Sequence, residues 1–403
     1  MNPNLPHLPD DFYAEHQHLR QIRRAAQANQ VSPDAVLACV LGRTAARLPI
    51  AATVNGSPVN YATAIVGSSG SGKSTSNRTA RNLIPDVGTD YDGRGVGSGE
   101  GLIQAYLSRR KTDDGGWQNV QTRHAALFYV DEGEGLLRLN NREGSTTMSI
   151  IRSMWSGDQV GNTNAQQETT RHLDADTYRF VFLVGLQPNY AAELLADDHA
   201  GTPQRFLWVA AGDPDAPPTP PTWPGPIELP TPPTAPFTLD DEVRRTVADR
   251  RHRANVEGGH HDPHESHASL IQLRTAAILA YLLDGRGIVT PFHWNLAAMI
   301  VDNSRQVRVE LRRHHESQQN ADEVNRQTNR LVNQDQASAN AHERRITSVG
   351  NVIVARLEKS GRLTLNEVRQ SIKSSDRGFL NEALDRLKSM GKVVHDAGRY
   401  RLA

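Results

Sequence analysis

The sequence predicts an α/β protein in which buried, mainly parallel strands form a central sheet and helices lie at both ends of the chain. Between residues 56 and 212, short apolar runs (61–66, 125–130, 178–186 and 206–210) alternate with Gly-rich turns and helical stretches, as buried parallel strands do. One of these runs leads directly into GSSGSGKST, residues 67–75, and then into a helical stretch over 74–83. The end of the chain has a different pattern, three helices followed by a hairpin.

Composition excludes several classes of protein. Of the 403 residues 37% are apolar, enough for a folded core, and 45 Lys and Arg balance 45 Asp and Glu, so any site for a polyanion must be local. The single cysteine, Cys39, excludes an internal disulfide framework and a cysteine-based zinc site. The longest apolar run, residues 276–283, is far shorter than the roughly 20 residues of a membrane helix. With no secretion signal, we expect a cytoplasmic protein without membrane contact.

Residues 1–55 form a predicted N-terminal helical region. Phe12, Leu19, Ile22 and Ala26 recur at helical spacing, which predicts one amphipathic helix over residues 10–29. Ser32-Pro33 then supplies a cap and a first-turn proline for a second helix that ends near residue 48.

The segment over residues 67–75 matches the P-loop pattern in its required strand-loop-helix context. Its glycines let backbone N–H groups turn toward a phosphate, Lys73 reaches the β and γ oxygens, and Ser74 offers a hydroxyl to Mg²⁺. ATP and Mg²⁺ are therefore the predicted cofactors. The expected nucleotide contacts are Gly67, Ser68, Ser69, Gly70, Ser71, Gly72, Lys73, Ser74 and Thr75.

A P-loop requires an acidic partner, and LFYVDE, residues 127–132, supplies one at the end of a buried strand that we expect to neighbour the P-loop strand. Asp131 is the predicted magnesium ligand, acting through water. Glu132 is the predicted base that orients and polarises the attacking water. Glu134, in a turn between two glycines, is the alternative base.

Two further residues complete the predicted catalytic set. Gln187 follows the strand 180–186 and either hydrogen-bonds the γ-phosphate or lytic water or simply caps the strand. Arg205, just before the run 206–210, is placed to reach a neighbouring subunit's nucleotide, or else pairs with a local carboxylate. Residues 155–170 are either a hairpin that projects into a ring channel or an ordinary polar loop.

The second half of the chain contains a linker and a helical region. Prolines every two or three residues over 213–237 predict an extended linker or a strap over the surface. Residues 238–344 are helical in pattern, clearest at 270–283 and 292–303, and polar nearly all round after residue 314. A histidine cluster in this region invites a zinc interpretation, although its Gly-rich context favours a solvated loop. Its members are His260, His261, His264 and His267.

Residues 345–403 predict a winged-helix DNA-binding domain, with helices over 348–359, 364–372 and 378–390 followed by two short strands. Residues 344–403 contain 13 Lys and Arg against 6 Asp and Glu, a local excess of about seven positive charges. This excess suits phosphate binding, with protein contact as the alternative. The candidate DNA contacts, on or beside the predicted recognition helix and on the wing, are Arg377, Arg386, Lys388, Lys392, Arg399 and Arg401.

Several motifs in order resemble an uncharacterised family of P-loop ATPases from bacteria, phages and actinobacterial mobile elements. They are GSSGSGKST, SGEGLIQAY (98–106), VDEGEGLLRLNNREGS (130–145), IIRSMWSGD (150–158) and TPQRFLWV (202–209). The resemblance covers about residues 10–310. Because members often occur beside primase-polymerase modules, it implies a replicative-helicase-like ATPase with a separate primase or polymerase as partner.

Residues 270–304 are similar to the lid of AAA+ replication ATPases, which a winged helix commonly follows. This resemblance implies an AAA+-like core, with a RecA-like core as the alternative, in a ring oligomer such as a hexamer. It also implies a lid arginine at the γ-phosphate. Arg274 is nearest to that role or, by offset, His267.

Together these features predict an ATP-dependent DNA helicase or a replication-initiator ATPase of a phage, plasmid or integrated mobile element. An ATP-switched DNA-binding protein without processive unwinding is one alternative. A defence or partner-remodelling ATPase is another.

Overall fold

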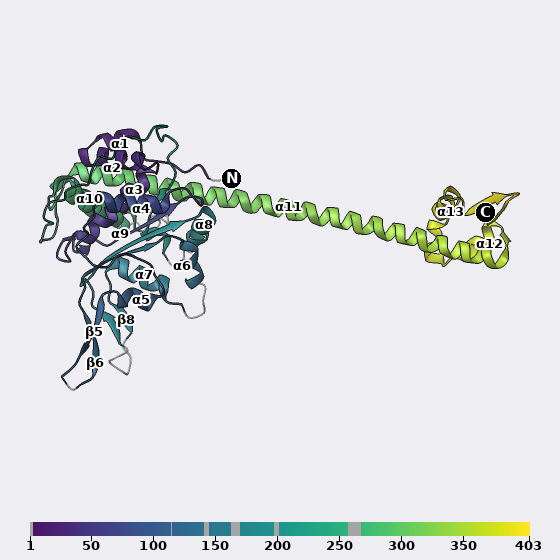
Figure 1. Ribbon diagram of the computed structural model, residues 1–403, viewed down its shortest axis with the longest axis horizontal. Helices are drawn as coiled ribbons and strands as arrows, with labels where there is room; N and C mark the ends of the chain where they lie inside the picture. The colour runs from purple at the N-terminus through teal and green to yellow at the C-terminus, as the bar shows by residue number, and fades with distance from the viewer. Residues whose placement is uncertain (1–2, 114, 141–144, 163–169, 197–200, 257–266) are drawn as a thin grey trace. The chain divides into compact units, whose positions relative to one another are not determined.

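The computed structural model describes residues 3–113, 115–140, 145–162, 170–196, 201–256 and 267–403 (Figure 1). The chain forms two compact units, Met1–Glu316 and Ser317–Ala403, and the boundary falls inside the helix α11 (Pro291–Ser360). Among the helices described, none is both long and apolar enough to cross a membrane.

The core of the first unit is a five-stranded parallel sheet. The strand order is β11 (Leu207–Ala210), β3 (Tyr61–Val66), β10 (Arg179–Leu186), β7 (Ala125–Val130) and β4 (Asp92–Arg94). The apolar runs at 61–66 and 125–130 are strands with the predicted bounds, and the other two begin one residue later than predicted. The α/β prediction with a central parallel sheet is confirmed. Strand β4 was the one strand of this sheet that was not predicted, because its sequence Asp-Gly-Arg contains no apolar residue.

The strand that ends at Asp131 does not neighbour the P-loop strand, because β10 lies between β3 and β7. The expectation of adjacent strands is therefore wrong. Every residue of β10 is buried, which suits the centre of a sheet covered on both faces. From β3 the chain runs toward β4, and from β10 it returns toward β11, so a crevice opens between the carboxyl ends of β3 and β10.

The N-terminal helices pack against this sheet. The amphipathic segment is two helices, α1 (Asp10–Ala14) and α2 (Gln17–Ala28), where one was predicted. The backbone of His16 is extended and its side chain accepts the N–H of His18, so a new helix starts there. As predicted, Ser32 caps α3 (Pro33–Arg47). Gly42 of α3 lies so close to β10 that a Cβ would come within 2.8 Å of the Leu183 side chain.

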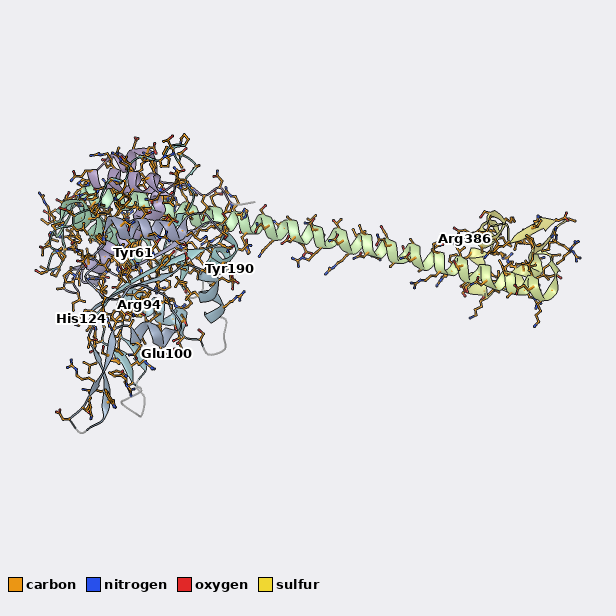
Figure 2. All side chains as sticks on the ribbon, viewed as in Figure 1. Tyr61, Arg94, Glu100, His124, Tyr190 and Arg386 are labelled. Atoms are coloured by element: carbon orange, nitrogen blue, oxygen red, sulfur yellow. The ribbon has the colours of Figure 1, made fainter. Side chains whose placement is uncertain are left out.

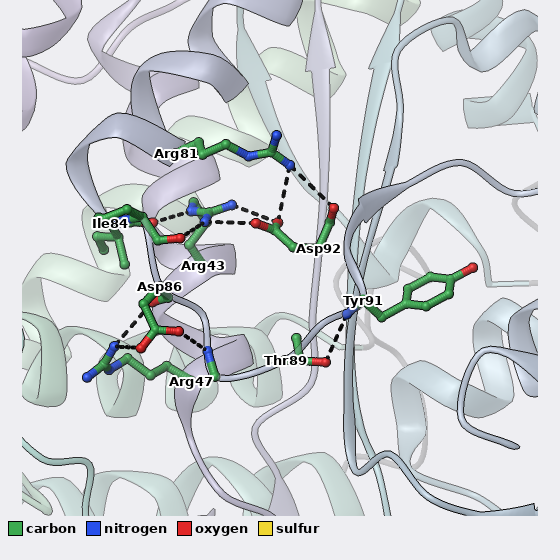
Figure 3. A network of polar contacts seen from close by, with 10 residues as sticks. Arg43, Arg47, Arg81, Ile84, Asp86, Thr89, Tyr91 and Asp92 are labelled. Atoms are coloured by element: carbon green, nitrogen blue, oxygen red, sulfur yellow. Dashed lines mark hydrogen bonds and ion pairs between the residues drawn. The ribbon is translucent and has the colours of Figure 1, made fainter. Parts of the chain in front are cut away.

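Arg43, a buried residue of α3, ties the edge of the sheet to the helices (Figure 3). Its guanidinium donates to both carboxylate oxygens of Asp92 in β4, at 2.8 and 3.1 Å. It also donates to the carbonyls of Ile84 (2.6 Å) and Pro85 (3.1 Å), just after α4 (Lys73–Leu83). Strand β4 is therefore held at the edge of the sheet by the Arg43–Asp92 ion pair and not by the burial of apolar side chains.

Two hairpins lie together at one end of the first unit (Figure 1). One pairs β5 (Leu107–Lys111) with β6 (Trp117–Gln121), and the other pairs β8 (Val160–Asn162) with β9 (Arg171–Leu173). The Asn119 amide donates to the Thr170 carbonyl at 2.9 Å and links them. The stretch predicted as a hairpin or loop spans the end of α7 (Thr147–Ser156) and β8, while its residues 163–169 lie outside the described residues. The β5–β6 hairpin was not predicted.

The remaining elements of the sheet region are short. They are the paired strands β1 (Thr53–Val54) and β2 (Ser57–Pro58), and the helices α5 (Gly99–Gln104), α6 (Gly133–Asn140) and α8 (Pro188–Ala196).

The Pro-rich segment 213–237 is a strap over the helices of the first unit. Gln21 donates to the carbonyls of Gly225 and Pro226 at 3.1 and 3.0 Å, and the N–H of Ile227 donates to Leu83 at 2.7 Å. The chain continues through β12 (Thr238–Leu239), α9 (Asp241–Val256), α10 (Ala268–Asp284), β13 (Ile288–Val289) and α11. One hydrophobic core runs from Leu5 to Leu311. The predicted N-terminal region, central core and lid therefore share a single core.

The second unit has a hydrophobic core of its own, formed by residues between Ile346 and Tyr400. After α11 come β14 (Arg362–Leu363), α12 (Leu365–Gln370), the 3₁₀ helix η5 (Ser374–Phe379), α13 (Leu380–Ser389), β15 (Val393–Asp396) and β16 (Arg399–Leu402). The strands form an antiparallel sheet in the order β14-β16-β15. Thr364 and Glu367 cap α12 reciprocally. Residues 319–345 of α11 are exposed, as their polar sequence predicts.

Candidate nucleotide site

The loop between β3 and α4 closes tightly on itself, and its glycines are required for this. Gly70 and Gly72 have φ angles of +78° and +87°, in the left-handed region. A Cβ at Gly72 would come within 2.7 Å of the Val31 side chain, and one at Gly67 within 2.4 Å of Ser71 Oγ. The loop therefore brings its backbone to the N-terminus of α4, where N–H groups favour an anion.

Lys73 lies over this loop. Its Nζ donates to the carbonyls of Gly67 and Ser68 at 2.8 and 2.7 Å. Burial lowers the pKa of Lys73, while the carboxylates of Asp131 and Glu132 raise it. The ammonium group therefore sits where phosphate oxygens can take over from the two carbonyls.

Asp131 meets the P-loop helix at the end of β7. Its Oδ1 accepts hydrogen bonds from Ser74 Oγ at 2.6 Å and from the Tyr129 hydroxyl at 2.7 Å. Burial and this hydrogen bond raise the pKa of Tyr129, so its O–H stays protonated at neutral pH and donates. A hydroxyl beside a carboxylate is the oxygen donor set that Mg²⁺ prefers, so Ser74 and Asp131 fit the predicted metal.

Sequence reasoning missed Tyr129. The signal was present, since residues two apart on a strand share a face and Tyr129 precedes Asp131 by two.

The two candidate bases differ in their partners. Glu134 forms an ion pair with Arg138 and a hydrogen bond with Tyr190 of α8 (Figure 2). No hydrogen bond or ion pair within the described part of the chain holds the Glu132 carboxylate. The geometry therefore favours Glu132 as the residue that takes a proton from water.

Glycines bring the ends of β7 and β10 together. A Cβ at Gly185 would lie 2.6 Å from the Asp131 carbonyl oxygen, and one at Gly133 would lie 2.3 Å from the Leu186 side chain. As a result Lys73, Ser74, Asp131, Glu132 and Gln187 line one cleft of about 210 Å³, the P-loop cleft. The structure thus brings these five predicted site residues together with Ser69 and Gly70, two further predicted nucleotide contacts.

Arg205 and Arg274 lie elsewhere, both over the ring of Trp155. Arg205, at the end of the 3₁₀ helix η3 (Pro203–Arg205), has its guanidinium carbon 5.7 Å from the centre of the Trp155 ring and donates to the Gly201 carbonyl at 2.6 Å. Arg274, only 2% exposed, is 4.2 Å from the same ring and donates to the Trp155 carbonyl at 2.8 Å and to Ser57 Oγ at 2.9 Å. We refer to Trp155, Arg205, Arg274 and His267 as the tryptophan cluster.

The surroundings lower the pKa values of two residues in the tryptophan cluster, Arg274 and His267. Burial, with Arg179 and Arg205 nearby, lowers the pKa of Arg274 to about 9. Burial and the two cluster arginines lower the pKa of His267, whose ring is 5.3 Å from that of Trp155, to about 4. His260, His261 and His264 lie outside the described residues, and no group of metal ligands occurs among the residues that are described.

The tryptophan cluster is at the amino edge of the sheet, opposite the P-loop. Because Leu207 pairs with Thr63, Arg205 is level with the start of β3. At about 3.3 Å per residue, Gly67 is roughly 20 Å further along the strand, beyond the reach of an arginine side chain. Arg274 and His267 both lie in the tryptophan cluster, so neither lines the P-loop cleft of its own chain.

The predicted DNA contacts of the second unit divide into two groups. Arg386 pairs with Glu343 (Figure 2), Lys388 pairs with Asp385 at 3.2 Å, and Arg377 and Arg401 donate to nearby backbone carbonyls. Lys392 and Arg399 are exposed, and their charged groups form no hydrogen bond or ion pair with another described residue, although Arg399 is near enough to Glu367 to help lower the pKa of that carboxyl group.

A further basic surface, not predicted from the sequence, lies on the β5–β6 hairpin. Arg109, Arg110 and Lys111 are exposed, and the Arg109 guanidinium is 5.5 Å from the ring of Trp117, which is 45% exposed. The turn sequence DDGG at residues 113–116 was the available signal for this hairpin.

Comparison with known proteins identifies no family for this chain. No family model matches the chain, and no curated protein matches it. Among solved structures it is similar to a full-length MCM homolog from Methanopyrus kandleri, with 14% identity and a TM-score of 0.39. The similarity covers 76% of this chain and 63% of that one, so the chain spans less than two thirds of the MCM homolog.

Proposed function

We propose that the protein is an ATP hydrolase that acts on DNA as a ring of subunits, as a helicase or replication-initiator ATPase. The observation that carries this proposal is the division of charged groups between the two edges of one sheet. Lys73, Asp131 and Glu132 surround a cleft at the carboxyl edge, whereas Arg205 is at the amino edge. If Arg205 stabilises the transition state in such a cleft, it therefore does so in the cleft of another subunit.

Within the cleft each residue has a defined task. Lys73 binds β- and γ-phosphate oxygens, and Glu132 takes the proton of the attacking water as that water is oriented by Gln187. Ser74 and Asp131 hold Mg²⁺, which neutralises charge on the phosphates when bound. The Tyr129 hydroxyl keeps the Asp131 carboxylate in place.

The tryptophan cluster supports the role of Arg205 in a neighbouring site. Burial and Arg152 lower the pKa of Arg205, and among the described residues Asp158 opposes them. A phosphate of a neighbouring subunit's nucleotide would stabilise the charge of this arginine. Arg274 is a positioning residue in this scheme, because it stacks on the ring that Arg205 contacts and binds the Trp155 carbonyl.

DNA contact is proposed at two places. The Arg109–Trp117 pair offers a stacking surface next to a cation, a combination that suits single-stranded nucleic acid. The second unit, proposed to be a winged helix, offers Lys392 and Arg399 to phosphates. A role in a phage, plasmid or integrated element, beside a separate primase or polymerase, is supported by the sequence resemblance alone.

A mixing experiment tests the central claim. Arg205→Ala subunits and Lys73→Ala subunits are each expected to be inactive, because every site in either ring is broken. In a mixed ring some interfaces join an intact P-loop to an intact Arg205, so ATPase activity is expected to return. If mixed rings form without any recovery, Arg205 does not act between subunits. Strand separation on forked duplex then distinguishes a helicase from an ATP-switched DNA-binding protein.

A further inference from the structure

A second cleft, of about 330 Å³, flanks the P-loop on the side away from Asp131. Its walls are residues 3–7, the P-loop residues Gly67, Ser68 and Ser71, and residues 210–214 after β11. We call it the N-terminal cleft. Its volume falls within the range of small-molecule sites, about 300–1,000 Å³.

The two clefts meet at the P-loop, so a single ligand can extend from one cleft into the other. Ser69, Gly70 and Lys73 line the P-loop cleft, and their loop neighbours line the N-terminal cleft. At the end of β10, Gln187 lines the first cleft and the next residue, Pro188, lines the second. With its phosphates in the P-loop cleft, a nucleotide can place its other end in the N-terminal cleft across the loop.

The N-terminal wall of this cleft is held in place by Asp34, which is 2% exposed. One carboxylate oxygen accepts the Leu8 N–H at 3.0 Å and lies 3.4 Å from His7 Nδ1. The other accepts the Tyr13 hydroxyl at 2.6 Å. These contacts of Asp34 within the chain hold the N-terminal wall in place without a ligand.

Two side-chain atoms of residues that line the cleft, Ser71 Oγ and Asp213 Oδ2, are buried without a hydrogen-bond partner among the residues described. Asp213 Oδ1 accepts the N–H of Asp215 at 3.1 Å, but Asp213 Oδ2 is buried and has no hydrogen-bond donor among the residues described. Burial raises the pKa of the Asp213 carboxyl group. Buried polar atoms are normally hydrogen-bonded, so this oxygen is suited to a donor on a ligand. Pro3, Leu5, Pro188 and Pro214 supply apolar surface around it.

We propose that the N-terminal cleft holds the base of the bound nucleotide and that Asp213 Oδ2 accepts a hydrogen bond from the exocyclic amine of adenine. The proposal rests on the nucleotide-binding part of the proposed function. Hypoxanthine has a carbonyl oxygen in place of this amine, so the carboxylate would face another acceptor. Asp213 therefore makes the site selective for adenine.

Titration calorimetry of the full chain with ADP and with IDP tests this selectivity without hydrolysis. A hydrogen bond to a charged group contributes about 1.5–3 kcal/mol, so ADP should bind roughly 10- to 150-fold more tightly than IDP. In Asp213→Asn the amide can donate to the hypoxanthine oxygen, and the ratio should fall to a few-fold. Asp215→Asn is the matched control, because it removes a neighbouring carboxylate charge and keeps the backbone N–H that donates to Asp213 Oδ1, and it should keep the wild-type ratio.

Several outcomes would overturn the inference. Equal binding of ADP and IDP by the wild-type protein does so without any variant. An unchanged ratio in Asp213→Asn, together with a native melting profile, shows that another group selects the base. Tighter binding of GDP than of ADP replaces adenine with guanine as the ligand. If no nucleotide binds at all, the proposed function itself fails.

Discussion

The two edges of the central sheet hold charge in different ways. At the carboxyl edge, Lys73, Asp131 and Glu132 surround an open cleft and their charged groups are exposed or half-buried. At the amino edge, Arg205 and Arg274 stack on Trp155, and Arg274 is almost completely buried. An open cleft can bind and release a phosphate chain, whereas a stacked guanidinium keeps one orientation. In the proposed function, the carboxyl edge binds the nucleotide and the amino edge presents a fixed cation to a neighbouring subunit.

The largest expected effect comes from the amino edge. Arg205→Ala should lower ATP turnover by roughly 10³- to 10⁵-fold with little change in ATP affinity, because the charge it stabilises develops only in the transition state. Steady-state kinetics and nucleotide titration measure the two quantities separately. Arg205→Lys, which keeps the charge and loses the planar fork, should recover only part of the activity. An equal loss of affinity would place Arg205 in the nucleotide site of its own chain or in the fold.

At the carboxyl edge, Glu132→Gln should lower turnover by about 10²- to 10⁴-fold while ATP still binds, since the amide keeps the shape and loses the base. Single-turnover hydrolysis and nucleotide binding provide the measurements. Glu134→Gln is the matched control and should change turnover only a few-fold, because Glu134 is held by Arg138 and Tyr190. The opposite ranking would make Glu134 the base.

A smaller effect tests whether the tryptophan cluster orients Arg205. A desolvated cation–π contact contributes about 2 kcal/mol, so Arg274→Met should lower turnover by roughly tenfold to thirtyfold with unchanged ATP affinity. In the Arg205→Ala background the same substitution should have no further effect on turnover. Additive losses would show that Arg274 acts independently of Arg205. Thermal melting of each variant separates this effect from loss of the fold.

Tyr129→Phe tests how firmly the carboxyl edge holds its metal ligand. One hydrogen bond contributes about 0.5–1.5 kcal/mol, so the Mg²⁺ concentration for half-maximal stimulation of ADP binding should rise about twofold to tenfold. Affinity for ADP without Mg²⁺ should stay the same. Tyr190→Phe, a tyrosine that lines the same cleft without contacting Asp131, is the control. If both variants shift the Mg²⁺ requirement equally, Tyr129 has no special role.

The smallest effect concerns the second unit. Replacing both Lys392 and Arg399 with Gln should reduce the slope of log DNA affinity against log salt by about 1.8, at roughly 0.9 per phosphate contact on duplex. The pair Arg386→Gln and Lys388→Gln should change it less, because acidic residues already neutralise both side chains. Binding titrations over a salt series measure the slopes. Equal slopes in the wild type and both double variants would show that these four residues do not contact DNA phosphates, and would leave the β5–β6 hairpin as the proposed DNA contact.

Features that depend on neighbouring residues could be predicted from the sequence. The strands at 61–66 and 125–130 have the predicted bounds, because a short apolar run between turn residues favours a buried strand wherever it packs. The P-loop comes directly after the first of these strands, and the acids at 131 and 132 come directly after the second. Their meeting in one cleft also followed, since the carboxyl ends of parallel strands lie at one edge of a sheet.

Other features depended on contacts between distant residues, and only the tertiary structure decided them. Strand β4 is held by Arg43, which is 49 residues away in sequence from Asp92. Arg274 binds Trp155 across 119 residues, and this contact places Arg274 at the amino edge, away from the P-loop. The N-terminal cleft joins residues 3–7 to residues 210–214. Local patterns give no information on such pairs, because their free energy depends on which surfaces the folded core brings together.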